Sequence, residues 1–124
     1  MKKNDAVGCG CFKAVVVDDD TAVRDITAIL IEVVLEKILV ERNIIIKTEE
    51  SAIDAYKTLI QGTYHLVITD YDMVKENGDE LIKKIRKNEI TQKIPVIGIS
   101  GKISNKELMI SAGADVFIAK PFGL

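Results

Sequence analysis

Two patterns of hydrophobic positions alternate along the chain. Short continuous apolar runs, such as the valine-rich KAVVVD at residues 13–18, are typical of strands buried on both faces of a sheet. Five segments fit this pattern, at residues 13–18, 44–48, 65–70, 94–100 and 115–120. Segments with helical spacing lie between them, at residues 21–42, 51–62, 77–89 and 104–114. The alternation predicts the order βαβαβαβαβ and a parallel sheet with helices on both faces.

Composition narrows the class of protein without indicating a function. The chain has 124 residues, 48% of them hydrophobic and 29% charged, which suits one domain with a sizeable core. Its formal net charge of −2 gives no support for binding to nucleic acid or to an anionic membrane. Residues 27–40 are apolar, but Glu32, Glu36 and Lys37 make them too polar to span a bilayer. No signal peptide is evident, so we expect a cytoplasmic location.

Polar side chains stand at the carboxyl ends of four predicted strands. Asp18 and Asp19 follow the first strand, Asp70 ends the third, Ser100 the fourth and Lys120 the fifth. Because the carboxyl ends of parallel strands share one edge of the sheet, where ligands bind, we expect these side chains to meet. Any one of them alone would be an ordinary turn, cap or surface residue, as we take Asp20 to be. The prediction of a site therefore depends on their convergence.

The predicted cluster favours phosphate chemistry. Three carboxylates at one edge repel one another, and a divalent cation or a lysine relieves that repulsion. Oxygen ligands without histidine or cysteine favour Mg²⁺, which often acts beside phosphate. Lys120 adds a positive charge and Ser100 a hydroxyl donor. Since phosphoryl transfer depends on positioning and charge neutralisation, these groups would stabilise a phosphoryl group on Asp70.

Two families with different chemistry resemble parts of this sequence. Asp70 and Asp72 in DYDMV resemble the first motif of haloacid-dehalogenase-type phosphatases, where they would be nucleophile and general acid. The segments VVVDDD, VITDYDM, VIGISG and AGADVFIAKPF together resemble the receiver domain of two-component response regulators. Chain order favours the receiver, because the acidic pair comes about fifty residues before Asp70 and nothing acidic follows Lys120. The receiver resemblance covers residues 13–122.

The receiver resemblance implies how the acidic residues act. Asp70 would be the phosphoacceptor, which receives a phosphoryl group from a histidine kinase or phosphotransfer protein. Asp19, Asp70 and the backbone carbonyl of Asp72 would bind Mg²⁺, with Asp18 acting through water.

The resemblance also implies how the site switches. Lys120 would pair with the phosphoryl oxygens, Ser100 would move to bond the phosphoryl group, and Phe117 would turn inward behind it. A cis peptide bond would join Lys120 to Pro121. His65 opens the third strand away from this edge and is expected to be structural rather than a phosphorelay histidine.

Three features depart from the receiver pattern. Val74 stands where receivers usually have proline, which loosens the loop and leaves an additional backbone N–H. Asp72 adds a carboxylate beside the phosphoacceptor, and we expect it to influence how long the phosphoryl group survives. Receivers normally continue after KPF with a fifth helix, for which the residues up to Leu124 leave no room.

The first predicted helix suggests how the chain compensates. Residues 21–42 form a helix about two turns longer than is usual in the family, and its surface is apolar nearly all round. A helix with this pattern is buried on most sides. We expect a homodimer or higher assembly in which it replaces the fifth helix across the interface. The alternative is that the chain was cut and that the natural protein has a fifth helix.

Together these inferences predict one receiver domain at residues 13–124 after a flexible N-terminal tail at residues 1–12. Cys9 and Cys11 are too few and too close for a disulfide framework or a complete zinc site, and their role is open. The fold class is α/β, a flavodoxin-like doubly wound five-stranded parallel sheet in the order 2-1-3-4-5, with an elongated first helix and no fifth helix.

The predicted function is that of a single-domain response regulator, which signals to an unidentified protein target. It would be no enzyme beyond slow loss of its own phosphoryl group. The alternatives are a receiver-shaped interaction module that is not phosphorylated and, from the other resemblance, a phosphatase.

Overall fold

The computed structural model of the chain describes residues 10–120, in which five parallel strands form one sheet. The strands are β1 (Cys11–Val17), β2 (Asn43–Glu49), β3 (Leu66–Asp70), β4 (Val96–Ser100) and β5 (Val116–Ala119). The helices are α1 (Thr21–Ile38), α2 (Ala52–Gln61), α3 (Gly78–Lys87) and α4 (Lys106–Ala112), with a 3₁₀ turn, η1 (Ile103–Asn105), before α4. The strand order β2-β1-β3-β4-β5 confirms the predicted flavodoxin-like α/β class.

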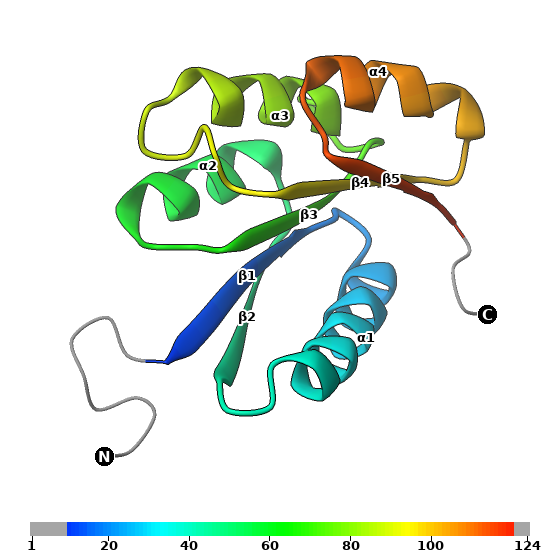
Figure 1. Cartoon of the computed structure of the whole chain (residues 1–124). Helices are drawn as coiled ribbons and strands as arrows, with labels where there is room; N and C mark the ends of the chain where they lie inside the picture. The colour runs from blue at the N-terminus through cyan, green and yellow to red at the C-terminus, as the bar shows by residue number, and fades with distance from the viewer. Residues whose placement is uncertain (1–9, 121–124) are drawn as a thin grey trace.

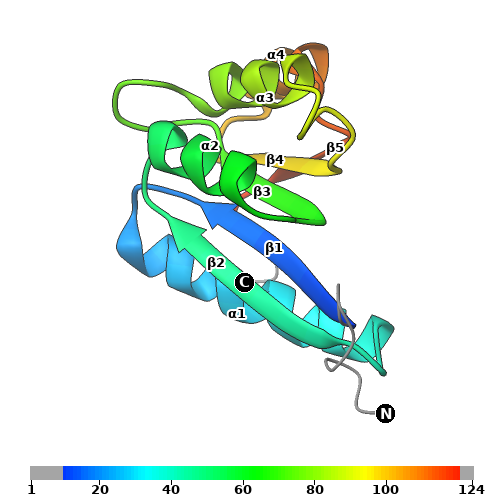
Figure 2. The same cartoon turned by 90° about the vertical axis from the view of Figure 1, so that its left-hand side faces the viewer.

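Helices cover both faces of the sheet. Among the helices of residues 10–120, α1 lies on one face of the sheet, and α2, α3 and α4 lie on the other (Figure 1), as the view turned by 90° also shows (Figure 2). Alternate residues of a strand point to opposite faces, so β1 contributes to a core on each side. Val15 and Val17 belong to the larger core under α2, α3 and α4. The smaller core, on the α1 side, consists of Ala14, Val16, Ile68 and Ile99.

The first helix ends earlier than its apolar pattern predicted, at Ile38 rather than near Arg42. The backbone N–H of Leu39 still donates to the carbonyl oxygen of Leu35 at 2.7 Å, but the chain then turns. It has to turn because β2 begins at Asn43 to pair with β1 along its whole length. Register in the sheet therefore overrides helical periodicity, although α1 remains the longest helix in the described part of the chain.

The start of the sheet also differs from the prediction. β1 begins at Cys11 rather than at Lys13, so Cys11 and Phe12 belong to the sheet. The guanidinium of Arg42 donates to the carbonyl oxygens of Gly10 at 2.6 Å and Cys11 at 3.1 Å, which fixes this end of the strand. Residues 1–9 of the predicted tail, including Cys9, and the predicted cis peptide at Pro121 lie outside the described residues.

The surface of α1 is less buried than expected. Thr27 is its one buried residue. Six large apolar side chains of the helix are at least about one third exposed: Ile26, Ile29, Leu30, Val33, Val34 and Ile38. In a single chain α1 is therefore largely exposed, and its burial in an assembly stays a prediction. None of the helices in residues 10–120 is long and apolar enough to cross a membrane.

Candidate functional site

Three carboxylates meet where β1 and β3 end. Asp18 and Asp19 directly follow β1, Asp70 is the last residue of β3, and these strands are neighbours in the sheet. One carboxylate oxygen from each of the three lies within 4.8 Å of the others. Asp18 and Asp70 are only 1% and 5% exposed, whereas Asp19 is open to solvent. The sheet register thus brings together the acidic residues that the sequence placed at separate strand ends.

Lys120 bridges two of these carboxylates. Its Nζ lies 3.1 Å from Oδ2 of Asp18 and 3.0 Å from Oδ1 of Asp70. The backbone N–H of Lys120 donates to the carbonyl oxygen of Ser100 at 2.8 Å, which holds this end of β5 beside β4. Burial lowers the pKa of Lys120, but the hydrogen bonds to Asp70 and Asp18 and their charges raise it above its ordinary value. The ammonium therefore stays charged at neutral pH.

One ammonium does not neutralise the cluster. Burial is the main cause that raises the pKa of Asp70 from 3.8 to about 6, although the hydrogen bond from Lys120 lowers it. The negative charges of Asp18 and Asp72 also raise this pKa. The site is therefore short of positive charge, and a bound cation would favour the ionised carboxylate.

The donor set fits a hard divalent cation such as Mg²⁺. Within residues 10–120, the groups that gather here are carboxylates, without a histidine or cysteine. Three carboxylates face one ammonium, so a divalent cation would balance the charge. Asp72 is exposed, and ligation through its backbone carbonyl stays a prediction.

Ser100 is fully buried at the end of β4. Its Oγ accepts hydrogen bonds from the backbone N–H of Lys102 at 3.0 Å and from Nδ2 of Asn105 at 2.9 Å. These bonds leave the hydroxyl proton of Ser100 available to donate. Asn105 was not predicted as a site residue, because it falls within the helix predicted at residues 104–114. In the structure it directly precedes α4. Here its side chain makes no capping hydrogen bond and binds Ser100 instead.

The backbone after β1 is held by a residue that the sequence did not single out. Nη1 of Arg24, one turn into α1, donates to the carbonyl oxygen of Asp18 at 2.9 Å. The backbone N–H of Asp20 donates to Oδ1 of Asp18 at 3.0 Å, and Asp20 itself caps α1 by accepting from Val23. The start of α1 therefore helps to position the acidic pair.

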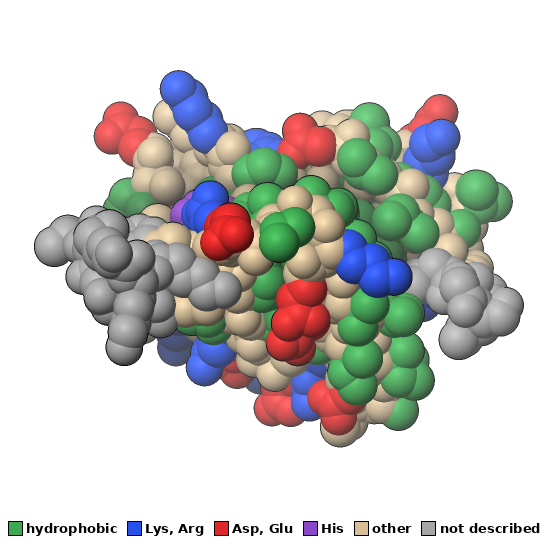
Figure 3. Space-filling view, turned by 60° about the horizontal axis from the view of Figure 1, so that its bottom comes forward, with side chains coloured by type: hydrophobic (Ala, Val, Ile, Leu, Met, Phe, Trp, Pro, Cys, Tyr) green, Lys and Arg blue, Asp and Glu red, His purple; other side chains and the backbone are tan. Residues whose placement is uncertain are grey.

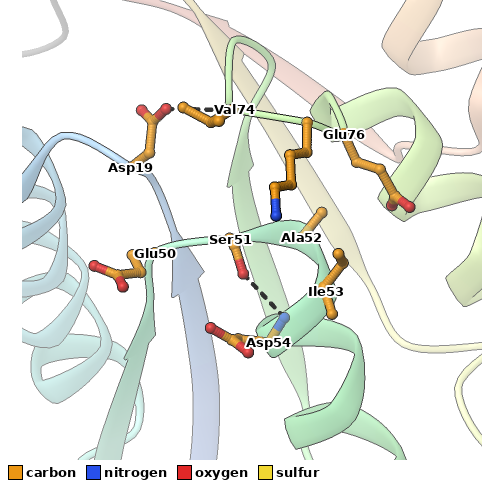
Figure 4. A pocket seen from close by; sticks show the side chains of 9 residues that line it. Asp19, Glu50, Ser51, Ala52, Ile53, Asp54, Val74 and Glu76 are labelled. Carbon is orange, nitrogen blue, oxygen red and sulfur yellow. Dashed lines mark hydrogen bonds between the residues drawn. The ribbon is translucent and has the colours of Figure 1, made fainter.

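The loop between β3 and α3 closes one side of the site. The backbone N–H of Gly78 donates to the carbonyl oxygen of Tyr71 at 2.8 Å, which folds the loop back on itself. A Cβ at Gly78 would lie 2.1 Å from the carbonyl oxygen of Asp70, so this close approach requires glycine. At the loop tip, the backbone N–H of Val74 donates to Oδ2 of Asp19 at 3.1 Å (Figure 4).

Two further residues from the sequence analysis lie away from the carboxylates. Phe117 is half-buried in β5 and packs against the larger core, and its inward turn stays a prediction. His65 precedes β3, where its Nδ1 accepts from the backbone N–H of Lys13 at 3.0 Å and its ring stacks on Phe12. These contacts give His65 a structural role.

Comparison with known proteins gives one consistent result. Residues 14–124 match the response regulator receiver domain family. The phosphate regulon transcriptional regulatory protein PhoB of Pseudomonas aeruginosa is 28% identical over 109 residues, which are 86% of this chain and 44% of that protein. The probable transcriptional regulator ycf29 of Pyropia yezoensis is 26% identical over 113 residues, 90% of this chain and 47% of that protein. The chain thus spans less than half the length of both relatives.

Solved structures show the same fold. A putative response regulator from Chloroflexus aurantiacus has a TM-score of 0.78 at 23% identity, covering 90% of this chain and 86% of that one. The response regulator TrrA of Thermotoga maritima, crystallised in complex with Mg²⁺ and BeF, has a TM-score of 0.73 at 28% identity, covering 90% and 89% of the two chains.

Proposed function

The chain belongs to the response regulator receiver domain family, and from this membership we propose that Asp70 accepts a phosphoryl group from a phosphohistidine. The donor would be a histidine kinase or a phosphotransfer protein. One observation carries the proposal: Asp70 is buried in a cluster of three carboxylates, with the Lys120 ammonium 3.0 Å away. This arrangement suits a group that gains further negative charge and needs neighbouring cations to hold it.

The proposed transfer balances as a simple substitution. A carboxylate oxygen of Asp70 attacks the phosphorus, an O–P bond forms, and the N–P bond to the donor imidazole breaks. The imidazole nitrogen leaves with the bonding electron pair and later takes a proton. Lys120, whose Nζ lies 3.0 Å from Asp70, would offset charge on the phosphoryl oxygens, and Ser100, once it has moved toward them, would donate its hydroxyl proton to one of them. Mg²⁺ would supply further charge neutralisation when bound.

The residues proposed to hold Mg²⁺ are Asp19, Asp70 and the backbone carbonyl of Asp72, with Asp18 acting through water. Support comes from the carboxylate oxygens of Asp18, Asp19 and Asp70, which lie within 4.8 Å of one another. The Thermotoga relative TrrA, which was crystallised in complex with Mg²⁺ and BeF, supports the same choice of metal by analogy.

The proposed output is a change of shape rather than a second reaction. Ser100 would move toward the phosphoryl group and Phe117 would turn into the space behind it, which changes the surface around β5. A protein target of unidentified kind would read that surface, in the cytoplasm. Turnover would be limited to slow hydrolysis of the aspartyl phosphate.

Self-association through α1 is also proposed. Figure 3 brings the α1 side of the molecule forward and shows hydrophobic side chains gathered beside acidic ones. Leu30 and Val34 of α1 and Ile118 of β5 line an apolar groove of about 240 Å³ between helix and sheet. The buried hydroxyl of Thr27 faces this groove and has no hydrogen-bond partner in the described residues. A second copy would cover this surface with its own α1.

Phosphorylation can be tested directly. We expect incubation with Mg²⁺ and a small acyl phosphate, followed by intact mass measurement, to show the gain of one phosphoryl group. Asp70→Asn should abolish the gain, and the conservative exposed variant Asp25→Asn should leave it unchanged. A wild-type chain that gains no mass would instead indicate an interaction module that is not phosphorylated. Hydrolysis of a phosphate ester without any adduct would indicate a phosphatase.

A further inference from the structure

Asp19 is held differently from the other two carboxylates. Asp18 and Asp70 are buried, and both accept a hydrogen bond from Lys120. Asp19 is exposed, and the contact that the described part of the chain gives its side chain is the backbone N–H of Val74, 3.1 Å from Oδ2. Without that contact, an exposed aspartate side chain would be free to rotate away from the cluster.

The donor exists because residue 74 is not proline. Proline has no backbone N–H, whereas valine contributes one at the tip of the loop between β3 and α3. Val74 is 70% exposed, so its side chain adds little packing and the backbone group is its main contribution to the site. Figure 4 shows this hydrogen bond crossing from the loop to Asp19, above the start of α2.

The loop aims this N–H through a specific backbone conformation. Lys75 has φ of 73°, in the left-handed region that residues other than glycine rarely occupy. The backbone N–H of Glu76 donates to the carbonyl oxygen of Val74 at 2.9 Å, and the side chain of Asn77 accepts from Met73 at 3.3 Å. Backbone conformations of this kind are often retained where they position a functional group.

We propose that Val74 is a positioning residue whose backbone N–H holds the Asp19 carboxylate ready for Mg²⁺. Oδ2 accepts the hydrogen bond, which leaves Oδ1 available to ligate the metal. The N–H dipole also offsets part of the repulsion among the three carboxylates. The inference rests on the proposed Mg²⁺-dependent function of the site. It predicts that the metal binds a carboxylate that is already in place.

The test compares Val74→Pro, which removes the N–H, with Val74→Ala, which keeps it and removes most of the side chain. Isothermal titration with Mg²⁺ alone should show affinity about three- to tenfold weaker for Val74→Pro, the effect of losing one ordinary hydrogen bond, because Asp19 is exposed and water replaces part of the lost contact. Val74→Ala should stay within about twofold of wild type, because a substitution at an exposed side chain has little effect. Unchanged or tighter Mg²⁺ binding by Val74→Pro would overturn the inference.

Proline also restricts the backbone conformation of the preceding residue, Met73. A second variant is therefore needed to distinguish the loss of the N–H donor from strain in the backbone. An ester linkage in place of the Val74 amide removes the N–H and keeps the valine side chain, and it should weaken Mg²⁺ binding to the same degree. Amide hydrogen exchange in the wild type should show Val74 protected despite its exposed position, and an unprotected amide would also overturn the inference. A wild-type chain that binds no Mg²⁺ would refute the proposed function itself, which is a different result.

Discussion

At the scale of single residues, Asp70 combines burial with negative neighbours. A buried carboxylate is disfavoured in its ionised form, and Asp18 and Asp72 add to this effect. Lys120 offsets only part of this rise, so the pKa of Asp70 remains at about 6. The ionised phosphoacceptor therefore destabilises the folded protein until a cation or a covalent modification changes the charge balance.

This makes stability depend on pH. The pKa of Asp70 is about 6 in the folded protein and 3.8 ordinarily, so between these values the folded state binds more protons than the unfolded state. In Mg²⁺-free buffer, protonation of Asp70 favours the folded state. This stabilisation should be complete below about pH 4 and should be lost as pH rises through about 6. We expect Asp70→Asn to raise the free energy of unfolding at pH 7.5 by up to about 3 kcal/mol, because asparagine removes the cost of burying an ionised carboxylate.

Urea unfolding across pH 4 to 8 measures this effect. The exposed variant Asp25→Asn is the matched control and should keep the wild-type pH dependence. An Asp70→Asn variant that is less stable than the wild type at pH 7.5 would show that the bond to Lys120 outweighs the cost of burial.

At the scale of elements, the site depends on how strands connect to helices. α3 begins immediately beside the end of β3, because Gly78 packs against the backbone of Asp70. The sequence indicated a helix near Asn77 from its amphipathic pattern, but not that its first residue must lack a side chain. Helical periodicity likewise did not predict where α1 stops, because pairing of β2 with β1 decides that point.

Gly78→Ala should therefore be strongly destabilising. The added Cβ would lie 2.1 Å from the carbonyl oxygen of Asp70 and would have to displace backbone. We expect a loss of about 3 kcal/mol in the free energy of unfolding, typical of overpacking against a rigid neighbour. Gly101→Ala is a matched control, since a Cβ there meets nothing within 4 Å, and it should cost less than about 0.5 kcal/mol. Thermal or urea unfolding of both variants decides the question, and equal stabilities would contradict this account of the loop.

At the scale of the whole molecule, the two faces of the sheet differ in how fully they are covered. Three helices pack over one face, and α1 covers part of the other (Figure 1). The exposed apolar side chains of α1 continue into the groove that Val34 and Ile118 line. Apolar side chains exposed side by side in this way are typical of a surface that binds a partner.

Self-association is the prediction at this scale. We expect multi-angle light scattering at micromolar concentration to give the mass of a dimer for the wild type. Val34→Glu, at a side chain 50% exposed beside the groove, should weaken the dimer by at least about tenfold, because a charge at the centre of an apolar interface is left unpaired. Ile90→Glu, at a side chain 66% exposed away from α1, should remain dimeric. A wild-type monomer, or a Val34→Glu dimer, would contradict the proposal.

The class of fold, and the residues that stand at the carboxyl ends of the strands, can be inferred from the sequence without coordinates. Apolar runs of strand length alternate with helical periodicity, and that pattern is sufficient for a parallel sheet covered on both faces. Chain order then placed Asp18, Asp70, Ser100 and Lys120 at one edge, because all parallel strands end on the same side. These features are local or topological, so they can be read along the chain.

The contacts between individual atoms, in contrast, depend on the three-dimensional fold. The bond from Val74 to Asp19 spans 55 residues, and the bond from Lys120 to Asp18 spans 102. Asn105, which the sequence pattern placed within a helix, binds Ser100 through its side chain. Such contacts depend on strand register, loop conformation and side-chain burial together. The local sequence around the two contacting residues does not determine any of these three.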